Sequence, residues 1–383
     1  MKKILFASLN DHVAWGGSEE LWSRTAMQLS KNYDVTAFVK KWSPDPNSIH
    51  MLKEAGVEIV YKHISKKKKR STFYKVLRKL RLYKNKSNNE FSSLQQPFQY
   101  NLAILSVGNS LDSKIISYTD FFKFHDIPYV LVIQLATDLR NAHDNLLSKL
   151  SVAYTEAKAV CFLSKDNLVK TEMNLGCKLD NITYINNPFN YEQKYVTPSL
   201  NSYHTIACVG AFTSFHKGQD LLISVLGQEK WKNRKIVLNL YGDGINKKQI
   251  ERLINRYDLH DKVKIIGYET DKEKIWSNNL ACIMPSRMEG QSLAMLEAMS
   301  FGRMIISTRV GDAERLIEEG TTGFLIDCAS LEAIDGCLEK AWEHKDFWIE
   351  MGKKMRKNLY STITVDPVEA FLKKTTNWIK HFS

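Results

Sequence analysis

The stretch Ala-Cys-Ile-Met-Pro-Ser-Arg-Met-Glu-Gly-Gln-Ser-Leu-Ala-Met-Leu-Glu-Ala-Met, residues 281–299, holds the signals that decide the fold. Residues 281–284 form a short apolar run, typical of a strand that is buried on both faces. A proline ends this run, a polar loop with Glu289 and Gly290 follows, and a helix begins near Gln291. We therefore predict a strand–loop–helix unit whose first helical N–H groups face a cleft and form an anion site.

The same alternation of short apolar runs and helix-length amphipathic segments continues along the whole chain. A first set of predicted strands lies at 4–9, 35–39, 57–61, 102–107, 129–133 and 160–163, and a second set lies at 204–209, 236–241, 263–266, 281–284, 304–307 and 324–326. Predicted helices include 19–29, 111–124, 139–156, 218–226, 247–257 and 292–300. Such alternation predicts parallel sheets covered by helices. We expect an α/β protein with two Rossmann-like, doubly wound domains that face a central ligand-binding cleft.

The boundary between the two domains should fall near Asn186-Asn187-Pro188, because proline disfavours helix in the residue before it and suits a hinge. A length of 383 residues also agrees with two domains. We predict an N-terminal domain at 1–190 and a C-terminal domain at 191–365. The helical segment 366–383 should pack back on the first domain.

The composition is that of a globular protein, with 44% hydrophobic residues and no apolar stretch of the roughly 20 residues that span a bilayer. The apolar run at the N-terminus is short and is interpreted as a strand rather than a signal peptide. Six cysteines lie far apart without a Cys-x-x-Cys pair. They predict buried, reduced thiols of a cytoplasmic protein rather than a zinc site or disulfide framework.

The positive charge is concentrated in one segment, between Lys62 and Lys86. This segment holds twelve Lys and Arg residues and no acidic residue, which equals the whole formal excess of +12. Apolar residues at helical spacing within 65–86 predict an amphipathic helix that docks on an anionic membrane surface, at the inner face of the plasma membrane. The docking residues would be Lys66, Lys67, Lys68, Lys69, Arg70, Lys75, Arg78, Lys79 and Arg81. A solvated basic loop is an alternative, whereas RNA binding is disfavoured because the rest of the chain is not basic.

Two further loops carry glycines at the ends of predicted strands. Gly210 ends a strand, and Lys217 stands at the start of the next helix, where a cation is unfavourable unless an anion is bound nearby. Gly16 and Gly17 follow the first strand, and their backbone amides could contact a phosphate or a sugar. Neither loop matches a dinucleotide-binding or P-loop motif.

Together these motifs resemble the family 4 retaining glycosyltransferases of the GT-B fold, within the glycosyl transferases group 1. The resemblance covers most of the chain and rests on the following residues: Glu289 and Glu297 of a Glu-x7-Glu pair, Lys217-Gly218, Gly242-Asp243-Gly244, Gly311 with Glu314, Gly320 with Gly323-Phe324, and Gly16-Gly17. It implies transfer of a sugar from a nucleoside diphosphate sugar to a hydroxyl of a saccharide or lipid-linked acceptor, in cell-surface glycan biosynthesis. It also implies that no metal and no other cofactor are required, and that the acceptor binds in the N-terminal domain.

The resemblance assigns catalytic roles to two residues. Lys217 would neutralise the diphosphate leaving group, and Glu289 would orient the donor sugar. The donor-binding residues would be Gly16, Gly17, Tyr268, Gly290, Gln291, Ser292, Leu293 and Glu297, with Glu297 on the ribose and Tyr268 beside the base.

The sequence departs from the family pattern at Ala211, where the family has an arginine that helps to bind the diphosphate. Arg287 and Arg309 lie on loops that should border the cleft, and we expect one of them to replace the missing cation. The alternatives are a slower enzyme and an unusual donor. The departure also keeps open a non-catalytic relative that binds nucleotide sugars without transferring them. A carbohydrate phosphorylase of the same fold is a further alternative, while a nicotinamide-dependent dehydrogenase is disfavoured by the absent glycine fingerprint.

Overall fold

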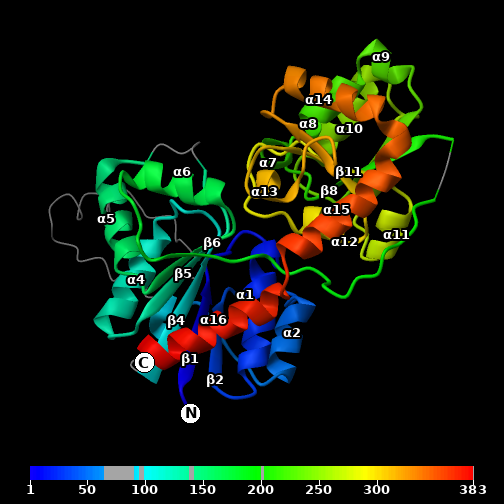
Figure 1. Ribbon diagram of the computed structural model, residues 1–383. Helices are drawn as coiled ribbons and strands as arrows, with labels where there is room; N and C mark the ends of the chain where they lie inside the picture. Colours follow the sequence, from blue (N-terminus) through cyan, green and yellow to red (C-terminus); the bar gives the residue numbers. More distant parts are fainter. Residues whose placement is uncertain (64–89, 95–98, 138–141, 200–201, 383) are drawn as a thin grey trace.

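The computed structural model describes residues 1–63, 90–94, 99–137, 142–199 and 202–382. It consists of two α/β domains that lie next to each other (Figure 1). The predicted doubly wound architecture is confirmed: each domain has one parallel sheet with helices on both faces. No helix in the described part of the chain is both long enough and apolar enough to cross a bilayer.

The first sheet has seven parallel strands in the order β3-β2-β1-β4-β5-β6-β7. The strands are β1 Lys3–Ser8, β2 Asp34–Val39, β3 Glu58–Tyr61, β4 Tyr100–Val107, β5 Tyr129–Ile133, β6 Ala159–Phe162 and β7 Ile182–Tyr184. The helices of this domain are α1 Gly17–Leu29, α2 Asn47–Glu54, α4 Lys114–Phe124, α5 Asp144–Thr155 and α6 Lys165–Leu175, with a 3-10 turn at Glu90–Ser93. β7 was not predicted, because it has only three residues and none of them is buried.

The central strand β1 shows why this sheet is covered on both faces. Leu5 and Ala7 pack against α4 and α5, whereas Ile4 and Phe6 pack against α1 on the opposite face. Side chains alternate between the two faces of a strand, so every residue from 4 to 8 is buried.

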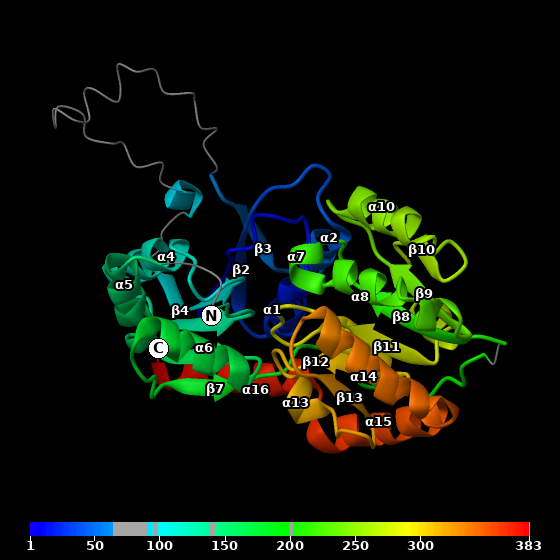
Figure 2. The ribbon, with the colours of Figure 1, turned by 90° about the horizontal axis from the view of Figure 1, so that it is seen from above.

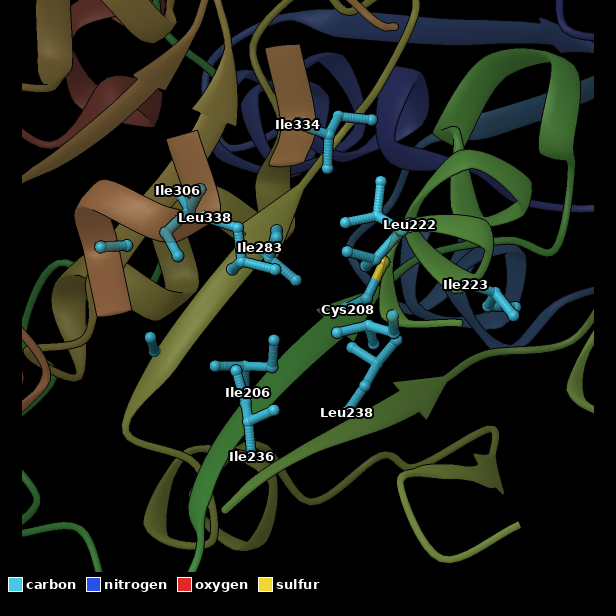
Figure 3. Packing of buried hydrophobic residues seen from close by; sticks show 14 of the residues in the cluster. Ile206, Cys208, Leu222, Ile223, Ile236, Leu238, Ile283, Ile306, Ile334 and Leu338 are labelled. Atoms are coloured by element: carbon cyan, nitrogen blue, oxygen red, sulfur yellow. The ribbon is translucent and has the colours of Figure 1, made fainter. Parts of the chain in front are cut away.

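The second sheet has six parallel strands in the order β10-β9-β8-β11-β12-β13. The strands are β8 His204–Val209, β9 Ile236–Tyr241, β10 Val263–Gly267, β11 Ala281–Met284, β12 Met304–Thr308 and β13 Gly323–Ile326. The helices are α7 Ser214–Lys217, α8 Gln219–Leu226, α9 Glu229–Lys232, α10 Lys247–Tyr257, α11 Lys272–Ser277, α12 Leu293–Ser300, α13 Ala313–Leu316, α14 Leu331–Glu343 and α15 Trp348–Thr362, with a 3-10 turn at Lys345–Phe347. Figure 3 shows one face of this sheet, where Ile206, Leu238 and Ile283 pack with Leu222 and Leu338 of α8 and α14.

Helix α16, Pro367–Phe382, leaves the second domain and packs on the first one (Figures 1 and 2). Phe371 and Ile379 of this helix belong to the same buried cluster as Ile4 and Trp22. The Lys2 ammonium also donates a hydrogen bond of 2.9 Å to the Ile379 carbonyl. The chain therefore crosses between the domains twice.

The order of the strands indicates where each sheet would bind a ligand. The order reverses beside β1 in the first sheet and beside β8 in the second. In doubly wound sheets, ligands bind at the carboxyl ends of the strands where such a reversal occurs. The loops after β1, β8 and β11 carry most of the predicted site residues, whereas Tyr268 follows β10 and Arg309 follows β12.

All six cysteines lie in the described residues and are free thiols, four of them buried. Burial raises the pKa of Cys208 to about 12, so this thiol stays protonated and unreactive at neutral pH. The four buried cysteines act as small apolar core residues, whereas Cys177 is half-buried and Cys328 is exposed, so the prediction of buried thiols is wrong for these two.

Candidate active site

A cavity of about 490 Å³ lies between the two domains. The first domain and the linker contribute Trp15, Gly17, Ser18, Gln134, Leu135 and Asn187, and the second domain contributes Val209, Gly210, Ala211, His216, Lys217, Tyr268, Lys272, residues 288–294 and Glu297. Almost all predicted donor-binding residues therefore line one cavity. Gly16 lines an adjoining cavity of about 600 Å³, which shares Gly17, Tyr268 and Glu297 with the first one.

Lys217 and Glu289 meet in this cavity. The Lys217 ammonium lies 2.7 Å from the Glu289 carboxylate, which also accepts a hydrogen bond of 2.8 Å from the Ser286 hydroxyl. The aliphatic stem of Lys217 lies over Gly210, where an added Cβ would be 3.4 Å from the Lys217 Cε. The two predicted catalytic residues thus form one partly buried ion pair.

The local backbone around Lys217 differs from the prediction that this residue begins a helix. Lys217 ends the short helix α7, and Gly218 adopts a left-handed conformation with φ of 68° before α8 begins. A side chain at Gly218 would also collide with the Pro285 carbonyl oxygen, which lies 2.0 Å from an ideal Cβ position. Glycine at this position allows the loop after β8 to contact the loop after β11.

Gln291 holds the start of α12 to the interdomain linker. Its side-chain oxygen accepts from the Asn187 backbone N–H at 2.5 Å, and its backbone carbonyl accepts from the Asn187 side chain at 2.8 Å. Its Nε2 donates to Asn186 at 2.9 Å and to Asp312 at 2.6 Å. The side chain of Gln291 is therefore a structural link, and the next two residues, Ser292 and Leu293, also line the cavity.

Two glycines allow the domains to approach each other closely. An added Cβ at Gly290 would lie 1.9 Å from the Gln134 carbonyl oxygen of the first domain. Gly311, with φ of 61°, donates its backbone N–H to Asp166 of α6 at 2.9 Å. These contacts fix the loop that carries Glu289 against the first domain.

Glu297 lies on α12 with its side chain 23% exposed, and its carboxylate pairs with Lys272 at 3.2 Å. Burial raises the pKa of the Glu297 carboxyl, although the Lys272 charge opposes this shift. Lys272 was not among the predicted site residues. It lines the same cavity as Tyr268, and only the folded arrangement of the loop after β10 reveals this.

Neither arginine that was expected to replace the missing phosphate cation lines the cavity, so this expectation is corrected. Arg287 makes a bidentate ion pair with Asp220, with both distances at 2.9 Å, and bonds to the Ser214 carbonyl at 2.6 Å. Arg309 pairs with Asp327 and Glu314, each at 2.9 Å. Both guanidinium groups are held by carboxylates outside the cavity.

The loop after β1 is held by buried charges. The Glu19 carboxylate accepts hydrogen bonds from Ser8 at 2.5 Å and Asn10 at 2.8 Å, and burial raises its pKa. Lys62 is buried and pairs with Asp11 at 3.1 Å. Lys62 therefore belongs to the core of this loop and not to an exposed basic helix, while the proposed docking residues 66–81 lie outside the described residues.

Comparison with known structures assigns the fold. The chain is similar over its full length to Anabaena HepE in complex with UDP, with a TM-score of 0.75, 15% identity, and coverage of 99% of this chain and 100% of HepE. Sucrose-phosphate synthase from Thermosynechococcus elongatus gives a TM-score of 0.73 at 17% identity, covering 99% and 98% of the two chains. The architecture is that of the GT-B glycosyltransferases, as predicted.

The sequence comparison identifies a domain. Residues 203–343, which hold the second sheet through α14, match the model of the family "Glycosyl transferases group 1". A glycosyltransferase of Haemophilus influenzae, whose function is uncharacterized, is 27% identical over 47% of this chain and 50% of its own length. The poly(ribitol-phosphate) alpha-N-acetylglucosaminyltransferase of Staphylococcus aureus is 28% identical over 38% of this chain and 30% of its own. The chain thus spans half or less of these two curated relatives.

Proposed function

We propose that this chain is a glycosyltransferase that moves a sugar from a nucleoside diphosphate sugar to an acceptor hydroxyl. The observation that carries the proposal is the convergence of Lys217, Glu289, Glu297 and the start of α12 on one cavity between the domains. This arrangement combines a cation, unpaired helical N–H groups and two carboxylates, which suit a diphosphate flanked by two polyhydroxylated rings.

The proposed reaction relies on electrostatic stabilisation of the leaving group. Lys217 and the backbone N–H groups at Ser292 and Leu293 would take up the negative charge that develops on the diphosphate. Glu289 would hold the hydroxyl groups of the transferred sugar, and Glu297 would hold the ribose. In the mechanism that we propose, the anomeric configuration is retained, as in family 4, the leaving phosphate accepts the proton of the acceptor, and no metal is required.

The substrate classes are proposed from the relatives. HepE has been crystallised with UDP and with UDP-glucose, which favours a UDP-hexose donor and a hexosyltransferase activity. The S. aureus relative is named for a poly(ribitol-phosphate) acceptor, which favours a saccharide, polyol or lipid-linked acceptor in cell-surface polysaccharide biosynthesis. We further propose a cytoplasmic protein that docks on the anionic inner face of the membrane through residues 66–81.

The experiment is a thermal-shift screen of the purified protein against UDP, GDP, ADP and their sugars, followed by product analysis by NMR. We expect stabilisation by one nucleoside diphosphate and an α-linked product from an α-linked donor. Absence of stabilisation by every donor would refute the proposal. Ala211 favours one alternative, a non-catalytic binding protein, which would be stabilised by a donor but would neither transfer nor hydrolyse it.

A further inference from the structure

Lys272 brings a second ammonium group to the cavity that contains Lys217. It is the first residue of α11, and its side chain is 44% exposed. It also lines the adjoining cavities of about 600 Å³ and about 450 Å³. Lys272 therefore lies where the three cavities meet.

Ala211 shares two cavities with this lysine. It lines the 490 Å³ and 450 Å³ cavities together with Lys272, and its methyl group offers no charge to a ligand. Arg287 and Arg309 are held elsewhere by Asp220, Asp327 and Glu314. Among the described residues, Lys272 is thus the one lysine or arginine that lines the 450 Å³ cavity together with Ala211.

Each of the two ammonium groups in the cavity forms an ion pair with a glutamate. Lys217 pairs with Glu289 at 2.7 Å, and Lys272 pairs with Glu297 at 3.2 Å. A ligand with hydroxyl groups on both sides of a diphosphate would hydrogen-bond to both carboxylates and present negative charge to both ammonium groups. Partly exposed ion pairs are individually weak, so Lys272 can leave Glu297 at a small cost.

We infer that Lys272 is the second cation of the diphosphate site, in place of the charge absent at Ala211, and that it moves from Glu297 to a phosphate when the donor's ribose binds to Glu297. This inference rests on the proposed function. The flexible four-carbon stem of lysine suits such a change of partner.

The test compares how tightly K272M, K272R and the control K264M bind a nucleoside diphosphate. The ligand is whichever of UDP, GDP and ADP stabilises the wild type most. Lys264 is a matched control, because its side chain is 46% exposed and its nearest carboxylate, that of Asp261, is 4.0 Å away. The dissociation constant of the nucleoside diphosphate is measured by calorimetry. That of the corresponding nucleoside, which has no phosphates, is measured by its competition with the diphosphate. We expect K272M to weaken the diphosphate by about 10- to 100-fold and the nucleoside by less than about threefold.

K272R should keep the diphosphate affinity within about threefold of wild type, and K264M should change neither constant. Equal losses for diphosphate and nucleoside would overturn the inference, because Lys272 would then act only by positioning Glu297 for the ribose. An unchanged diphosphate affinity in K272M would also overturn it while leaving the proposed function intact. A wild-type protein that binds none of the three diphosphates would refute both.

Discussion

Substitution of Gly290 by alanine should push the two domains apart at their contact. An ideal Cβ at this residue would lie 1.9 Å from the carbonyl oxygen of Gln134 and 3.2 Å from the Leu163 side chain. The first of these neighbours is backbone at the carboxyl end of β5 and cannot rotate away. The loop of Gly290 is itself held by Gly311, whose own Cβ position lies 2.1 Å from the Gly290 carbonyl oxygen.

The expected displacement follows from these distances. A carbon and an oxygen that are not bonded to each other approach to roughly 3.3 Å, so G290A must open the domain contact by about 1.4 Å. A misplacement of about 1 Å between reacting groups lowers a rate about 100-fold. Because Lys217, Glu289 and Glu297 all belong to the second domain, nucleoside diphosphate affinity should change by less than about threefold. We therefore expect a loss in kcat for transfer without a comparable loss in binding.

The assay is steady-state sugar transfer together with calorimetric titration of the nucleoside diphosphate, using G336A as the control. Gly336 lies in α14 with nothing within 4 Å of its Cβ position, so alanine there should stabilise the helix by about 1 kcal/mol and leave kcat unchanged. If folded G290A retained kcat within threefold of wild type, the domain contact seen here would not be the one in which transfer takes place.

Three further predictions concern the charges. K217A should lower kcat by about 100-fold with little change in Tm. Full activity of this variant would show that Lys217 does not bind the diphosphate. E297Q should weaken donor binding by about 10- to 100-fold. A donor affinity equal to that of the wild type would show that Glu297 does not bind the ribose. Since burial raises the Glu297 pKa above 4.5, wild-type donor affinity should fall on acidification as this carboxylate gains a proton, and E297Q should lose that pH dependence. Deletion of residues 66–86 should release the protein from anionic liposomes in a flotation assay, and retained binding would contradict a basic docking helix.

Much of the fold could be predicted from the sequence because its strands are short apolar runs buried on both faces. The edge strand β7 was missed, since its residues Ile182–Tyr184 are not buried and carry little of that signal. Most of the site residues could be predicted as a group, because they follow strands next to a reversal of strand order, whereas Tyr268 follows the edge strand β10.

The parts of the site that could not be predicted depend on side-chain directions in three dimensions. Arg287 and Arg309 are on the predicted loops, but Asp220 and Asp327 lie close enough to bind them away from the cavity. The link between Gln291 and Asn187 joins residues far apart in the chain, and no spacing in the sequence indicates it.

The return of α16 to the first domain has a consequence for biosynthesis. The surface of α1 and β1 that Phe371 and Ile379 cover stays open during synthesis until α16 has been made, and α16 follows the whole second domain in the chain. The first domain therefore completes its core only after the second domain has been synthesised, although domains at the amino end generally fold first. The contacts that α16 makes with the first domain thus form only when the second domain has already been made.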